Sequence, residues 1–117
     1  MSDKQFRTFY WASLRQIIMA LIEEGFVPEL RTQGSYNSRL EVIRDLPKGT
    51  VIWHLYLTDI ELGQAALGGT QCIVGSVPQS LLQCGTIEEV EAFSRRLIDI
   101  AGKDGGFVLS SPGGLGK

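Results

Sequence analysis

Hydrophobic residues recur along the chain with a helical period near its start and in short apolar segments after it. The first twenty-five residues have apolar side chains at helical spacing, at Phe6, Tyr10, Leu14, Ile17, Ile18 and Leu21. Ser2 followed by Gln5 predicts a capping box at the start of this helix. Gly25 suits its end. The segment therefore predicts one long amphipathic helix.

Four short segments have the length and residue types of buried strands: 26–31, 50–57, 70–75 and 107–110. Between them lie three helical segments, each opened by a predicted capping box. These pairs are Ser38 with Glu41, Thr58 with Glu61, and Thr86 with Glu89. The last of these helices has apolar residues on one face, namely Val90, Phe93, Leu97 and Ile100. Alternation of strands and helices predicts an α/β fold with a parallel sheet and helical crossovers, in one domain over 1–117.

Composition excludes several classes of function. The chain has 11 basic and 13 acidic residues, a net charge of -2, and no basic stripe, which argues against nucleic acid as a partner. The longest apolar run, 17–22, is far too short to span a membrane, and the polar start MSDKQF is not a signal peptide. Cys72 and Cys84 form no disulfide framework. We therefore expect a cytoplasmic protein with two reduced thiols and no membrane partner.

Three familiar catalytic or binding motifs fail on spacing. The ending GGLGK is similar to the tail of a P-loop, but Ser111 stands where that motif needs glycine and nothing follows Lys117. A looser anion site remains open, because loops after parallel strands expose backbone N–H groups. His54 and the two cysteines lack metal-ligand spacing, so we expect no metal site. A hydrolase triad would require His54, Asp59 and a serine to converge, which nothing in their spacing favours.

Three stretches resemble the uroporphyrinogen decarboxylase superfamily, and within it the branch similar to corrinoid-dependent methyltransferases. They are YNSRLEVIRDLPKG (36–49), LGGTQCIVGSVPQSLL (67–82) and GTIEEVEAFSRRLIDIAGKDGGFVLSS (85–111). The resemblance implies a (β/α)8 barrel, a fold that needs about 250 residues. A chain of 117 residues with four strands would then be the C-terminal half of such a barrel, with 107–110 as its eighth strand.

The resemblance also implies which family chemistry is missing. Zinc-dependent members use His-x-Cys-Gly after an earlier strand, where this chain has Arg31-Thr32-Gln33-Gly34. They use a further cysteine after the last strand, where this chain has Pro112-Gly113-Gly114, and the histidine of the decarboxylases is absent from this loop too. Arginine and glutamine are not useful zinc ligands. We therefore expect no bound cofactor and no family catalysis by the chain alone.

Candidate binding residues remain where a barrel places its site, at the carboxyl ends of strands. They are Arg31, Gln33, His54, Tyr56, Ser76 and Ser111, with Ser110 beside the last. Arg31 could clamp a carboxylate or phosphate with two hydrogen bonds, or it could be an ordinary solvated loop arginine. For Tyr36, Arg39 and Glu41 we expect helix capping and surface pairing rather than binding.

Three hypotheses for function stay open. We favour a stand-alone barrel half that does not catalyse by itself, self-associates with a dimer favoured, and binds a small anionic or tetrapyrrole-like ligand. In the second hypothesis the strands form a self-contained open sheet that binds a small anion near Arg31 and the terminal glycines. In the third, the chain is half of a decarboxylase or a corrinoid methyltransferase that another chain completes.

Overall fold

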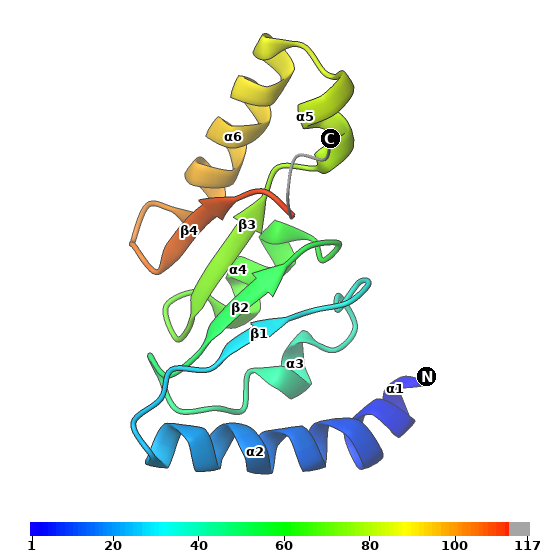
Figure 1. The fold of residues 1–117 in the computed structure, drawn as a ribbon, viewed down its shortest axis with the longest axis vertical. Helices are drawn as coiled ribbons and strands as arrows, with labels where there is room; N and C mark the ends of the chain where they lie inside the picture. Colours follow the sequence, from blue (N-terminus) through cyan, green and yellow to red (C-terminus); the bar gives the residue numbers. More distant parts are fainter. Residues whose placement is uncertain (113–117) are drawn as a thin grey trace.

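The computed structural model describes residues 1–112 and contains a parallel sheet flanked by helices (Figure 1). The four strands are β1 (Glu29–Arg31), β2 (Ile52–Leu55), β3 (Cys72–Ser76) and β4 (Phe107–Ser110). A long N-terminal helical segment precedes β1 and consists of α1 (Asp3–Gln5), η1 (Phe6–Trp11) and α2 (Ala12–Glu23). The crossovers contain α3 (Leu40–Ile43), α4 (Ile60–Leu67), α5 (Gln79–Cys84) and α6 (Ile87–Ala101). The predicted α/β fold with helical crossovers is confirmed.

The strands lie in the order in which they occur in the chain. The sheet order is β1-β2-β3-β4, and all three pairings are parallel. Right-handed crossovers between sequential neighbours place every crossover helix on the same face of a sheet. This is the arrangement of consecutive units in a barrel, although four strands leave the sheet open, with β1 and β4 as its two edges.

The two faces of the sheet therefore differ. The register aligns Leu30, Trp53, Ile73 and Phe107 on the face that the helices cover. On that face the Trp11 and Trp53 rings lie 6.3 Å apart. The opposite face has the alternate residues, which include Glu29, Arg31, His54, Cys72, Val74 and Val108. In Figure 1, α4 lies behind β2 and β3 while no helix lies in front of them. We refer to this opposite face as the open face.

The protein is less compact than its length predicts. Its radius of gyration is 15.0 Å, whereas a compact domain of this length has about 13 Å. Its accessible surface is 7399 Å², whereas a folded monomer of this mass exposes about 6,300 Å². The excess is the expected property of a sheet with one uncovered face and two free edges.

The N-terminal helical segment differs from the predicted single stripe. Residues Phe6–Trp11 form a π-helical turn, which widens the helix and rotates the residues after it. As a result Phe6, Trp11 and Ile18 are buried in the core. Tyr10, Ile17 and Leu21, predicted to join that core, are instead 45%, 59% and 38% exposed. The segment therefore has two apolar stripes, and only one of them packs on its own sheet.

Of the four predicted capping boxes, one is confirmed in full, one is confirmed as an N-cap bond alone, and two are wrong. Ser2 and Gln5 form both hydrogen bonds of a capping box, and Thr86 Oγ1 accepts from the Glu89 N–H. Ser38 does not cap α3, whose N-cap is Arg39. Thr58 does not cap α4 either, because the next residue, Asp59, accepts the helix N–H groups and Thr58 accepts from the Tyr36 N–H instead. The six-residue helix α5 was not predicted at all.

The amino ends of β2 and β3 are joined by one buried side chain, that of Gln71. Its Oε1 accepts from the N–H groups of Thr50 and Val51, each at 3.1 Å. Its Nε2 donates to the Pro47 carbonyl at 2.7 Å and to the Leu46 carbonyl at 3.4 Å. Gln71 is 4% exposed. The loop before β2 is thus tied to the start of β3 by this side-chain amide and by the bond from the Gly49 N–H to the Thr70 carbonyl, at the end of the sheet opposite to the candidate site.

Candidate functional site at the carboxyl ends of the strands

A charged cluster lies on the open face, across β1 and β2. The register pairs Arg31 with His54, and Glu29 is on the same face two residues before Arg31. His54 Nε2 forms a hydrogen bond with Glu29 Oε1. Arg31 Nη2 lies 3.7 Å from the same carboxylate oxygen. One carboxylate therefore holds a histidine and an arginine side by side.

The hydrogen bond to Glu29 sets the chemistry of the imidazole. A carboxylate accepts only, so a neutral His54 carries its proton on Nε2 and keeps Nδ1 as an acceptor. The His54 side chain is 12% exposed, whereas those of Glu29 and Arg31 are 50% and 64% exposed. The Tyr56 ring lies 5.8 Å from the imidazole. The cluster thus presents one imidazole held by a carboxylate and one mostly exposed guanidinium, a group that binds carboxylates and phosphates.

The loops beside this cluster are bonded to each other. The Tyr36 N–H donates to Thr58 Oγ1 at 2.9 Å, and the Asp59 N–H donates to Asn37 Oδ1 at 2.8 Å. Thr32 is fully buried, and both its N–H and its hydroxyl donate to the His54 carbonyl. These bonds tie the segment after β1 to β2 and to the segment after β2. They give the cluster a rigid rim.

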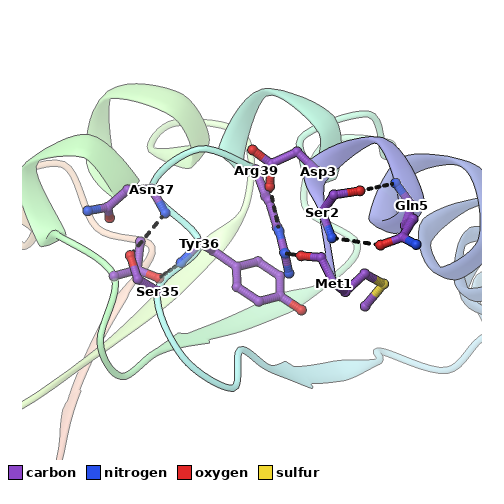
Figure 2. Close-up of polar contacts among 9 residues, drawn as sticks. Met1, Ser2, Asp3, Gln5, Ser35, Tyr36, Asn37 and Arg39 are labelled. Carbon is purple, nitrogen blue, oxygen red and sulfur yellow. Dashed lines mark hydrogen bonds and ion pairs between the residues drawn. The ribbon is translucent and has the colours of Figure 1, made fainter.

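Arg39 fastens the same loop to the N-terminal helix (Figure 2). Its guanidinium lies 4.5 Å from the centre of the Phe6 ring and 5.6 Å from that of Tyr36. It donates to Asp3 Oδ1 at 3.0 Å and to the Met1 carbonyl at 2.8 Å. The bond from Arg39 holds the pKa of the Asp3 carboxyl below its usual range, and burial raises the pKa of the Tyr36 hydroxyl. The surface pairing expected of Arg39 is confirmed, and it positions the loop after β1.

A small cavity opens between the carboxyl ends of β2 and β3 and the helices α4 and α6. Its volume is about 180 Å³, and its lining residues with polar side chains are Tyr56, Thr58, Asp59, Ser76 and Arg96. Arg96 donates to Glu61 Oε1 at 2.9 Å at its rim. The Ser76 hydroxyl is buried, without a hydrogen-bond partner among residues 1–112. A cavity of this size fits a small anion or a few waters, since drug-sized ligands fill about 300–1,000 Å³.

The structure brings together only part of the predicted set. Arg31, His54 and Tyr56 form one cluster, and Ser76 lies on the next strand at the rim of the cavity. Gln33 is exposed in the loop after β1. Ser111 follows β4, three strands from β1 and therefore about 14 Å away. The terminal glycines expected to form an anion loop, residues 113–117, lie outside the described residues.

Two residues that matter to the cluster were missed by sequence reasoning. Glu29 contacts both His54 and Arg31, and Thr32 fixes the His54 carbonyl. The alternation of Glu29 and Arg31 about Leu30 indicated that they share a face, but only the register of β1 on β2 brings His54 to them.

Other chemistry is limited within the described part of the chain. No three histidine, cysteine, aspartate or glutamate side chains of residues 1–112 gather as a metal-ligand set. Cys72 lies on the open face, where burial raises the pKa of its thiol. A thiol with a raised pKa is a weak nucleophile and a weak ligand. None of the described helices is both long enough and apolar enough to cross a membrane.

Comparisons with known proteins found no matching family, no similar curated protein and no similar solved structure.

Proposed function

We propose that this chain is a barrel half that self-associates and binds a small anion on its open face. A single chain does not by itself catalyse the decarboxylation or methyl transfer of the superfamily that it resembles. The observation that carries the proposal is that a charged cluster lies on the uncovered face of an incomplete sheet. Glu29, Arg31 and His54 lie on a face that no described helix covers, between two unpaired strand edges. Free edges and uncovered sheet faces are stabilised by a partner.

Charge and size favour an oxyanion as the ligand. Arg31 is mostly exposed and only loosely paired, at 3.7 Å, so a carboxylate or phosphate can compete with Glu29 for its guanidinium. The 180 Å³ cavity beside Tyr56 and Ser76 lies on the side of the strands that α4 and α6 cover, so it is separate from the Arg31 cluster. That cavity is too small for a tetrapyrrole, and side chains fill the interior of an eight-stranded barrel, so a small anion is favoured over a tetrapyrrole-like ligand.

A binding experiment tests this proposal. The native mass of the purified chain is measured first by light scattering after gel filtration, and we expect a folded dimer. Thermal shift is then measured with inorganic phosphate, a short dicarboxylate and a free-base tetracarboxylate porphyrin. At a hundredfold excess over its Kd, a ligand stabilises the folded state by about 2.7 kcal/mol.

Matched variants show whether the cluster is the binding site. We expect Arg31→Ala to weaken anion binding about tenfold or more. Arg95→Ala is the control, because Arg95 is 75% exposed on α6 and its ion-pair partner among residues 1–112 is Glu91, one turn away. A folded monomer that responds to none of the three ligands would refute the proposal. A response that survives Arg31→Ala would move the binding site elsewhere.

A further inference from the structure

The second apolar stripe of the N-terminal helix is only partly covered within residues 1–112, where the Tyr10 ring lies 5.2 Å from the Phe6 ring. Tyr10, Ile17 and Leu21 follow one another at helical spacing and are 45%, 59% and 38% exposed. Phe26 and Val27, which lead from the helix into β1, are 63% and 62% exposed. In Figure 1, α2 lies on the β1 side of the sheet, next to the edge where a further strand would pair in a barrel. We refer to these five residues as the α2 strip.

The opposite edge has an apolar surface that lacks a helix. Leu109 pairs in register with Gly75, so its side chain lies on the helix-covered face of β4. It is nevertheless 42% exposed, because α6 packs on β4 and against α4 and no described element lies beyond β4. Ile98 on α6 is also exposed, at 46%. In a βα-barrel the next helix would cover this position and the next strand would pair with β4.

The chain itself supplies a helix and a strand of the required kind. β4 needs a parallel strand beside it, and the free edge of β1 needs the same. A second copy placed by a two-fold axis brings its β1 to β4 and its α2 strip over Leu109 and Ile98. The same axis repeats this contact at the other pair of edges, which gives eight strands and leaves no free edge.

Charge and area favour a second copy over an unrelated partner. The N-terminal helical segment and α6 both precede a strand and run opposite to it, so their starts lie at the same end of a closed ring. The first begins with exposed Lys4 and Arg7, and α6 begins with exposed Glu88 and Glu91. The chain exposes about 1,100 Å² more than a folded monomer of its mass. A stable interface needs about 800 Å² from each partner.

We propose that the α2 strip of one copy packs on Leu109 and Ile98 of a second copy, with β1 of the first pairing with β4 of the second. This inference rests on the proposed self-association and specifies its seam. The two surfaces of the seam are different, and the two-fold axis repeats the seam, so that it occurs twice in one isologous dimer interface. The closed ring would enclose both Glu29–His54–Arg31 clusters.

Charged substitutions at the seam are the first test. Ile17→Asp and Leu109→Asp each place a carboxylate in the predicted contact, and we expect each to weaken the dimer about a hundredfold or more. The control is Leu62→Asp on α4, because Leu62 is 47% exposed and far from both edges of the sheet. Circular dichroism confirms that each variant is folded. A dimer that survives both seam substitutions overturns this inference and leaves self-association standing, whereas a monomeric wild type overturns both.

Crosslinking tests directly whether the two different surfaces meet across the seam. Tyr10→Cys and Leu109→Cys are made singly and together in a Cys72→Ala, Cys84→Ser background and treated with a short bismaleimide. Tyr10 is chosen for its height along the strands. Its neighbour Trp11 contacts Trp53, and the register aligns Trp53 with Phe107, two residues before Leu109. We expect crosslinked dimer from the double variant and from a mixture of the two single variants, and none from either single variant alone. Efficient crosslinking of a single variant, or none of the double variant, would overturn the proposal.

Discussion

Replacing Gln71 by leucine removes the one side chain that pins the loop before β2 to β3. Leucine has a similar volume, so the change removes hydrogen bonds without opening a large cavity. The N–H groups of Thr50 and Val51 lose their acceptor. The Val51 N–H is buried, since Val51 is 2% exposed. The Pro47 carbonyl keeps a second donor, the Thr50 hydroxyl, and the bond to Leu46 is long. The loss of folding free energy therefore comes mainly from the two N–H groups that are left without an acceptor.

The size of this effect follows from the contacts. An unpaired buried donor costs about 1–3 kcal/mol, and the half-buried N–H of Thr50 costs less because water can reach it. We expect Gln71→Leu to lower the free energy of unfolding by about 3 kcal/mol, against a total of about 5–15 kcal/mol for a domain of this size. In a thermal melt this is a fall of roughly 10 °C.

Two further variants sharpen the test, and each is compared with the wild type at the same pH by urea denaturation. Gln71→Glu keeps the acceptor but places an oxygen against the Pro47 carbonyl, so it destabilises at pH 7. Burial raises the pKa of a glutamate at this position, so the loss should shrink as the pH falls from 7 toward about 4, where the protonated carboxyl can donate again. Gln33→Leu, at an exposed loop position, should change stability by less than about 0.5 kcal/mol. Our reasoning is refuted if Gln71→Leu is as stable as Gln33→Leu.

Three other predictions concern acid stability, packing and thiol reactivity. The pKa of Asp3 is lowered by Arg39, so the pair contributes stability that is complete above the unfolded pKa of 3.8 and is lost as the pH falls through the lower folded pKa. Stability curves of the wild type and Asp3→Asn should therefore differ at pH 6 and converge in strong acid, and a constant gap would contradict this. Gly75→Ala should cost about 1–3 kcal/mol in a urea melt, because the added Cβ would lie 2.8 Å from the Phe107 ring. Cys72, whose pKa is raised by burial, should react with iodoacetamide much more slowly in the native protein than in urea, and equal rates would show that the open face is freely accessible.

The sequence predicted those features that depend on neighbouring residues. Three features were predicted correctly, because each depends on a few adjacent side chains. They are the capping box of Ser2 and Gln5, the helix end near Gly25 and the bounds of β4. Thr58 was mistaken for a cap because Asp59 competes for the same helix N–H groups. Only the contact of Thr58 with Tyr36, 22 residues away, shows what the threonine does instead.

The candidate site was predicted by position and missed in detail. The carboxyl ends of parallel strands correctly indicated Arg31, His54 and Tyr56 as neighbours. The role of Glu29 could not be predicted, because it depends on the register between strands that lie 23 residues apart in the chain. Likewise the exposure of Ile17 depends on the π-helical turn, which changes the angle at which the helix meets the sheet.

The sequential order of the strands has a consequence for how the chain folds. Each strand pairs only with its neighbour along the chain, so every ladder closes one short loop and none requires the two ends of the chain to meet. Such an arrangement behaves as a row of coupled units, in which stability is greatest in the middle and falls toward the ends. In the monomeric chain, amide hydrogen exchange should accordingly be slowest in β2 and β3 and fastest in the outer strands, β1 and β4. Joining two copies would convert the row into a ring, in which no unit is terminal.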